Sequence, residues 1–213
     1  MTSRHRVIVF AAALLAVLAP ERPAWAGQPT EQLRHQIDRV LIVLGDPELR
    51  KEPRALDRRA AVRKIANDIF DFPETAQRSL ARHWAPRTPA ERSEFVELFA
   101  DLLERSYISK IEVYGGERIQ YVGETIDGDK ASVRTKITTK QGSDIPIEYR
   151  LLHRGGRWLV YDVVIEGVSL VANYRTQFNK IITTSSYKEL VKKMRTKQEE
   201  FLEEERQRRT SLK

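Results

Sequence analysis

The sequence predicts an α+β fold in which a four-stranded antiparallel meander sheet packs against a helical layer. Apolar residues recur at helical spacing up to Gly115-Gly116, and beyond that pair they alternate with polar residues as in strands. Three short turns that contain glycine separate four runs of this second kind, at 118–126, 130–139, 145–153 and 157–165. Connections this short cannot make the crossovers of a parallel sheet, so consecutive strands are expected to pair antiparallel.

Helix start and stop signals delimit four helical patterns before the sheet, at 30–45, 56–70, 80–84 and 88–107. The clearest start is Thr-Pro-Ala-Glu at 88–91, a capping box with proline at the first helical position. After the last strand, Ser169 is a candidate N-cap for a fifth helix, and a second capping box at 186–189 begins a sixth. The last strand is apolar on both sides and should be covered on both.

Residues 1–26 have the pattern of a signal peptide. Two arginines precede an apolar run at 7–19, and an A-x-A cleavage pattern follows at 24–26. An uncleaved membrane anchor is the alternative, but this run is well short of the roughly 20 residues that span a bilayer. We therefore expect export, cleavage after Ala26 and a folded domain over 27–197, followed by a charged, solvated helical tail at 198–213 that frays.

Charge and cysteine content narrow the classes of partner. The net charge of +7 becomes +5 once the expected signal peptide is removed. Outside the cytoplasm, chromosomal DNA, NAD and ATP are implausible partners, whereas anionic membrane surfaces and acidic proteins remain plausible. Because the chain has no cysteine, disulfides, zinc ribbons and thiolate nucleophiles are excluded.

No set of residues forms a recognisable catalytic or metal-binding motif. His35, His83 and His153 lie on different elements without metal-ligand spacing, and the glycine pairs match no phosphate-binding loop. We therefore expect no metal, no cofactor and no catalytic residue. Asp162 interrupts an apolar strand and leaves two interpretations. It is either a structural carboxylate bonded to backbone or to an arginine such as Arg175, or a general base in a cone-shaped pocket.

A long string of residues carries a family resemblance. Trp-Leu-Val-Tyr-Asp-Val-Val-Ile-Glu-Gly-Val-Ser-Leu-Val at 158–171 is followed by Tyr-Arg-Thr-Gln-Phe at 174–178, and Phe-Asp-Phe at 70–72 precedes both. This pattern resembles the MlaC family, also described as the toluene-tolerance auxiliary component of an ABC transport system. The resemblance extends over roughly 30–197, and the charged tail departs from the usual family ending.

The resemblance implies a periplasmic carrier that holds the acyl chains of a phospholipid in a cavity and leaves the headgroup in water. It also implies a sheet similar to nuclear transport factor-like cones, packed on helices. The expected partners are the periplasmic component of an inner-membrane ABC lipid transporter, an outer-membrane lipoprotein complex and, transiently, the membrane. Expected lipid-lining residues are the apolar ones of the strands and of the helices over them: Phe72, Phe99, Leu103, Tyr107, Val133, Ile137, Ile147, Tyr149, Leu151, Trp158, Val160, Val168, Val171 and Tyr174.

Three alternatives stay open beside the phospholipid carrier. A related branch associated with hopanoid synthesis could carry a triterpenoid, a pocket enzyme of the ketosteroid-isomerase type could use Asp162 and a tyrosine, and an adaptor could use the basic surface and the tail. Each apolar residue could also be ordinary core. For docking to acidic partners or anionic headgroups, the predicted patch is Arg134, Lys136 and Arg150 on the polar face of the sheet.

Overall fold

The computed structural model describes residues 28–51, 54–112 and 115–211, so the expected signal peptide lies outside the described residues. The chain forms α1 (Gln28–Gly45), α2 (Ala55–Ile69), α3 (Phe72–Leu80), a 3₁₀ turn η2 (Ala81–His83) and α4 (Pro89–Glu112). Four long strands follow: β1 (Arg118–Asp127), β2 (Lys130–Thr138), β3 (Asp144–Arg154) and β4 (Arg157–Ile165). A short β5 (Val168–Ser169), α5 (Leu170–Thr184) and α6 (Tyr187–Ser211) complete the described chain.

The α+β prediction and the antiparallel meander are confirmed. The strand order is β1-β2-β3-β4-β5, and every neighbouring pair is antiparallel. The fifth strand was not predicted. Glu166 and Gly167 have φ angles of 50° and 82° and form a tight turn that folds β5 back along β4.

Capping interactions fix the starts of α4 and α5 where the sequence predicts them. The third helix was predicted at 80–84 but runs from Phe72 to Leu80, because Asp71 caps it and Pro73 stands in its first turn. In α4 the amide of Glu91 donates to the Thr88 hydroxyl at 3.2 Å, while the amide of Thr88 donates to the Glu91 carboxylate at 2.8 Å. The Ser169 hydroxyl accepts from the amide of Ala172 at 3.0 Å and so caps α5. The expected tail is a direct continuation of α6, and Phe201 packs under the Arg105 guanidinium of α4 at 5.1 Å from the ring centre.

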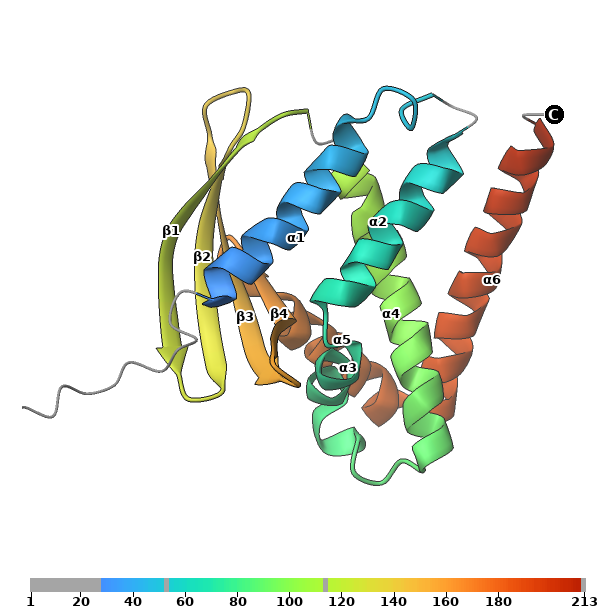
Figure 1. Ribbon diagram of the computed structural model, residues 1–213. Helices are drawn as coiled ribbons and strands as arrows, with labels where there is room; N and C mark the ends of the chain where they lie inside the picture. The colour runs from blue at the N-terminus through green and yellow to red at the C-terminus, as the bar shows by residue number, and fades with distance from the viewer. Residues whose placement is uncertain (1–27, 52–53, 113–114, 212–213) are drawn as a thin grey trace, which may run out of the picture.

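Two separate hydrophobic clusters form the interior. Figure 1 shows the sheet on one side of the molecule, α2, α4 and α6 farther away, and α1 crossing the sheet between them, where it contacts β1, β2 and β4. The sheet core comprises Leu33, Ala131, Val133, Leu151, Trp158, Val160 and Val163. The helical core comprises Ala76, Leu80, Phe95, Leu98, Phe99, Tyr174, Phe178, Tyr187, Leu190, Val191 and Met194.

Asp162 fastens α5 to the sheet. It pairs with Arg150 in the β3–β4 ladder and is 4% exposed. Its carboxylate accepts from the Ser169 hydroxyl at 2.7 Å, from the amide of Val171 at 3.1 Å and from the Arg150 guanidinium at 3.2 Å. The structural interpretation therefore holds, with Arg150 as the partner, whereas Arg175 instead donates to the carbonyl of Arg78.

Ala81 has a backbone conformation that only glycine adopts without strain. It follows α3 with φ 48° and ψ −122°. For a residue with a Cβ atom, such a conformation costs on the order of 1–3 kcal/mol. Its amide donates to the carbonyl of Gln77 and its carbonyl accepts from the amide of Trp84 at 3.0 Å, and these two hydrogen bonds hold it there.

We predict that Ala81→Gly raises the free energy of unfolding by about 1 kcal/mol, because relief of strain exceeds the extra entropy of the unfolded chain. Urea denaturation monitored by circular dichroism measures the change. Ala60→Gly on the exposed side of α2 is the matched control and should lower stability by about 1 kcal/mol. Equal losses in both variants would show that Ala81 is not strained.

We also predict that Asp162→Asn lowers the free energy of unfolding by about 2 kcal/mol. The amide replaces one acceptor oxygen by a donor, which leaves a buried donor on Ser169 or Val171 without a partner. Denaturation of the exposed Asp144→Asn variant provides the comparison and should show a much smaller loss. If the two variants were equally stable, Asp162 would not be the anchor of α5.

Candidate functional site

The face of the sheet that α1 covers is the inner face. Tyr149 on β3 is paired with Val133 on β2 and with Val163 on β4. Because side chains alternate between the two faces of a sheet, and directly paired residues share a face, all three lie side by side on the inner face. Val133 and Val160 are completely buried. The apolar strand pattern therefore forms one continuous inner surface that must be kept from water.

Helix α1 covers this surface with few apolar side chains and several polar contacts. Leu33 is buried in the sheet core, and Ile37 packs at its border. At the start of α1, Thr30 donates to the Glu124 carboxylate of β1 through both its amide and its hydroxyl. The backbone amide of Trp158 in β4 donates a hydrogen bond to the Gln32 side chain at 2.9 Å. The start of α1 is thereby fixed to the edge of β4.

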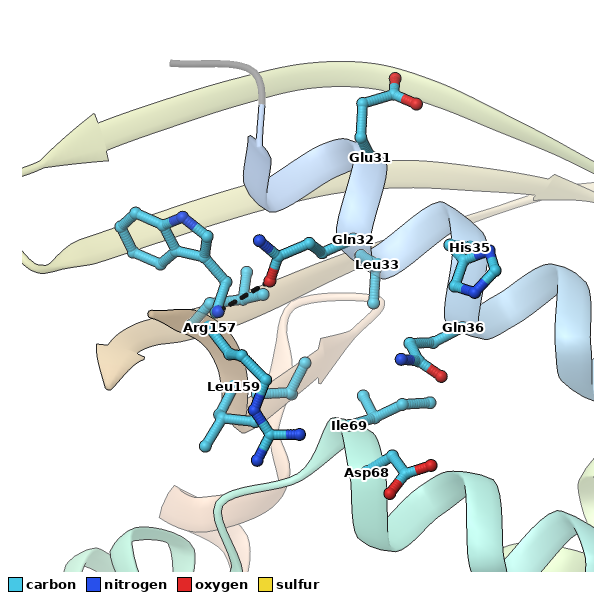
Figure 2. Close-up of a pocket in the computed structure, with 12 residues that line it drawn as sticks. Glu31, Gln32, Leu33, His35, Gln36, Asp68, Ile69, Arg157 and Leu159 are labelled. Atoms are coloured by element: carbon cyan, nitrogen blue, oxygen red, sulfur yellow. Dashed lines mark hydrogen bonds between the residues drawn. The ribbon is translucent and has the colours of Figure 1, made fainter. Parts of the chain in front are cut away.

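Two hollows border α1, one on each side. The first, which we call the β4-edge pocket, lies between α1, the end of α2 and the start of β4 and has a volume of about 360 Å³ (Figure 2). The second, the β1 hollow, lies between α1 and β1 and measures about 450 Å³. Both volumes fall within the range of small-molecule sites, about 300–1,000 Å³.

The β4-edge pocket has an apolar floor and a polar rim. Its floor is formed by Leu33, Ile69, Leu151, Trp158 and Val160. Its rim carries Glu31, Gln32, His35, Gln36, Asp68 and Arg157, and most of these are labelled in Figure 2. Because the floor belongs to the sheet core, this pocket leads from solvent directly to the apolar inner face.

The β1 hollow is more polar. The Arg34 guanidinium stacks on the Tyr121 ring at 4.6 Å, and Ile37, Leu41 and Ile119 supply its apolar wall. The Tyr121 hydroxyl is buried and makes no hydrogen bond to any described residue, and burial raises its pKa well above the ordinary tyrosine value. Tyr121 is therefore an uncharged donor.

The predicted lipid-lining residues are divided between the two cores. Val133, Ile147, Tyr149, Leu151, Trp158 and Val160 belong to or border the sheet core, whereas Phe99, Leu103, Tyr107 and Tyr174 belong to or border the helical core. Ile137 is half-buried, Phe72 stacks on Phe70, Val171 is buried and Val168 is 58% exposed. Of the whole set, Leu151, Trp158 and Val160 line the β4-edge pocket.

Sequence reasoning missed the side of the site that α1 and α2 contribute. Leu33 and Ile37 are recognisable as one face of a helix, but helical spacing does not say which surface that face covers. Ile69 ends α2 and carries only a generic helical pattern. His35 and Arg157 belong to no motif that could mark them as neighbours across a pocket.

The inner face does not bring together the groups that a pocket enzyme of the ketosteroid-isomerase type would need. The half-buried Tyr149 lies on it beside the Thr135 hydroxyl, and burial raises the pKa of Tyr149 to about 12. Asp162 pairs with Arg150 and therefore points to the opposite face, under α5. Within residues 28–51, 54–112 and 115–211, no group of His, Asp and Glu side chains could hold a metal ion.

The predicted docking residues share the outer face but are largely paired. Lys136 contacts Asp144 at 2.9 Å, and Arg150 contacts both Glu148 and Asp162. The Arg134 guanidinium is exposed and lies against Gly123 of β1, where a larger residue would displace it. Of the three residues, Arg134 presents its charge most freely.

Comparison with known proteins identifies the family. The family model described as MlaC protein matches residues 34–196. Toluene tolerance protein ttg2D of Pseudomonas putida is 27% identical over 141 residues, which cover 64% of this chain and 66% of that protein. The intermembrane phospholipid transport system binding protein MlaC of Haemophilus influenzae is 23% identical over 138 residues, covering 61% and 64%.

The described part of the chain also has a solved structural relative. The phospholipid-binding protein from Ralstonia solanacearum, solved in complex with a phospholipid, has a TM-score of 0.68 at 24% identity and covers 78% of this chain and 94% of that one. Within the described ranges, no helix is both long and apolar enough to cross a membrane. The chain spans just under two thirds of the length of the two relatives matched by sequence. Because the family model covers most of the chain, this protein belongs to the MlaC family.

Proposed function

We propose that this protein is a non-enzymatic phospholipid carrier that holds acyl chains between α1 and the inner face of the sheet. The observation that carries the proposal is the β4-edge pocket, in which a polar rim leads to an apolar floor continuous with the sheet core. Such a surface fits a molecule that is polar at one end and apolar at the other. The name of the Haemophilus influenzae relative agrees with this ligand class.

The energetics explain why a carrier needs no catalytic group. Two acyl chains of about fifteen methylenes each cost on the order of 24 kcal/mol to expose to water, at about 0.8 kcal/mol per methylene. A site lined by Leu151, Val160 and Ile69 replaces that exposure by contact with another apolar surface. The barrier to transfer then falls without any bond being broken.

The two hollows suggest where the chains lie. Both border α1, and they flank the few apolar contacts that Leu33 and Ile37 make with the sheet. Chains that enter from the β4-edge pocket would replace contacts of α1 with the inner face while the helical core stays packed. The aromatic contacts of that core, such as Phe99 with Phe178 at 5.1 Å, lie outside this path.

We further propose that the carrier works in the periplasm, after removal of residues 1–26. There it would exchange lipid between an outer-membrane lipoprotein complex and the periplasmic component of an inner-membrane ABC transporter. The family membership and the name of the Haemophilus relative support this setting.

We predict that Ile69→Trp lowers the fraction of protein that carries phospholipid several-fold, because the indole fills the floor of the β4-edge pocket. Native mass spectrometry of protein purified without detergent measures the loaded fraction. Ile42→Trp is the matched control, since Ile42 lies on the solvent side of α1 and is 72% exposed. Full loading of Ile69→Trp, or wild-type protein that yields no lipid on organic extraction, would contradict the proposal.

We predict that the association rate with the transporter's periplasmic component falls steeply with added salt while lipid retention does not. Exposed charges farther apart than about 10 Å lose most of their interaction at 0.1 M salt, whereas apolar contacts do not. Arg134→Glu with Lys136→Glu should slow association at low salt, as measured by stopped-flow fluorescence. Lys188→Glu with Lys192→Glu on α6 is the control pair. Equal rates for the wild type and the sheet variant would remove this patch from docking.

A further inference from the structure

We propose that Arg157 binds the phosphate of the carried lipid at the rim of the β4-edge pocket. This inference rests on the proposed function and adds a selectivity to it. A pocket with only an apolar floor would accept any diacyl lipid, whereas a cation at its rim favours a lipid with a phosphodiester.

Two arginines flank the turn between β3 and β4, and they differ in their ion pairs. Gly155 and Gly156 have φ angles of 55° and 77°, which allows a two-residue turn that places Arg154 directly opposite Arg157. Arg154 is committed to the fold, with contacts to Asp71 at 3.0 Å and to Glu74 at 2.6 Å. The Arg157 side chain has no ion pair or hydrogen bond to any residue that the structure describes, and it is exposed.

The acidic residues of the rim do not neutralise Arg157. Glu31 pairs with Arg34 at 3.7 Å, and Asp68 pairs with Arg39 at 3.1 Å, so both carboxylates already face a cation. Figure 2 shows Arg157 extending from β4 past Leu159 toward the end of α2, with its guanidinium free at the mouth of the pocket. The positive charge therefore lies at the rim, above the apolar floor.

His35 approaches the same pocket from α1. It lines the rim, is exposed, and makes no ion pair or hydrogen bond within the described ranges. A guanidinium offers two parallel donors to a phosphate, so Arg157 can bind that group without a second residue. Figure 2 shows the two side chains well apart on the rim, so His35 marks a second polar position on α1 while Arg157 on β4 supplies the charge.

The pocket presents charged, polar and apolar groups in the same order, from solvent inward, as a phospholipid does. From solvent inward, the pocket presents cation and imidazole, then the amides of Gln32 and Gln36, then Leu33, Ile69 and Leu151. A phospholipid presents phosphate, ester groups and chains in the same order. A neutral diacylglycerol lacks the first of these and would leave Arg157 without a counter-charge.

The test is a competition between two lipids with identical chains. Lipid-free protein is incubated with equimolar palmitoyl-oleoyl phosphatidylglycerol and palmitoyl-oleoyl glycerol in mixed micelles, and native mass spectrometry gives the ratio of the two complexes. We expect the preference for the phospholipid to fall about tenfold in Arg157→Gln, since the variant loses a charge-assisted contact that its exposure to solvent keeps moderate in strength. Arg157→Lys should keep part of the preference, because lysine cannot bind in the bidentate manner.

Two control variants show whether the change in the lipid ratio is specific to Arg157. Lys192→Gln on α6 removes the same charge far from the pocket and should leave the ratio unchanged. An unchanged ratio in Arg157→Gln, or an equal fall in Arg118→Gln at the β1 hollow, would overturn the assignment while leaving the carrier function intact. Wild-type protein that loads neither lipid would instead overturn the carrier function itself.

A final measurement distinguishes the lipid phosphate from a free anion. Inorganic phosphate alone, added to lipid-free protein, should not raise the melting temperature, because the rim without the chains supplies one weak exposed contact. If inorganic phosphate stabilised the wild type but not Arg157→Gln, and the lipid ratio stayed constant, the site would serve a free anion and the inference would be wrong.

Discussion

The need to cover the inner face of the sheet determines the rest of this structure. Side chains such as Val133 and Val160 are completely buried, and they stay so because α1 lies across them. Leu33 supplies the central apolar contact, while Thr30 and Gln32 fix the start of α1 to Glu124 and to the edge of β4. Polar contacts of this kind fix position at a small net gain in free energy. A helix held in this way can give up part of its apolar contact to a lipid without loss of its position.

The separation into two cores gives the molecule a fixed part and an adaptable part. In the helical core, Phe95, Phe99 and Phe178 pack edge to face, with ring centres 5.1–5.5 Å apart in the two T-shaped pairs. Such aromatic contacts are directional and resist rearrangement. The sheet core lacks a comparable cluster among the described residues and borders both hollows. We therefore assign the fixed part to the helical core and the adaptable, ligand-binding part to the sheet core.

Sequence patterns predicted where the helices and strands lie better than they predicted which of these elements contact one another. The change of apolar period and the capping boxes located the strands and helix starts, because both signals are local. The division of the predicted lining between two cores was not predictable, since Val160 and Phe99 look alike as buried apolar residues until their partners are known. The same limit applies to Arg154 and Arg157, which differ only in which carboxylates lie within reach.

A carrier must bind its ligand firmly enough to cross an aqueous compartment and still release it, and the arrangement of this site divides those tasks. The chains supply most of the free energy through burial, which is insensitive to salt and to the identity of the headgroup. We propose that Arg157 supplies selectivity from an exposed position, where a contact with phosphate is modest and screened. On this proposal an acceptor can compete for the phosphate at the rim before the chains begin to leave. Release then starts at the solvent end of the lipid, because loss of the phosphate contact costs less free energy than exposure of the chains.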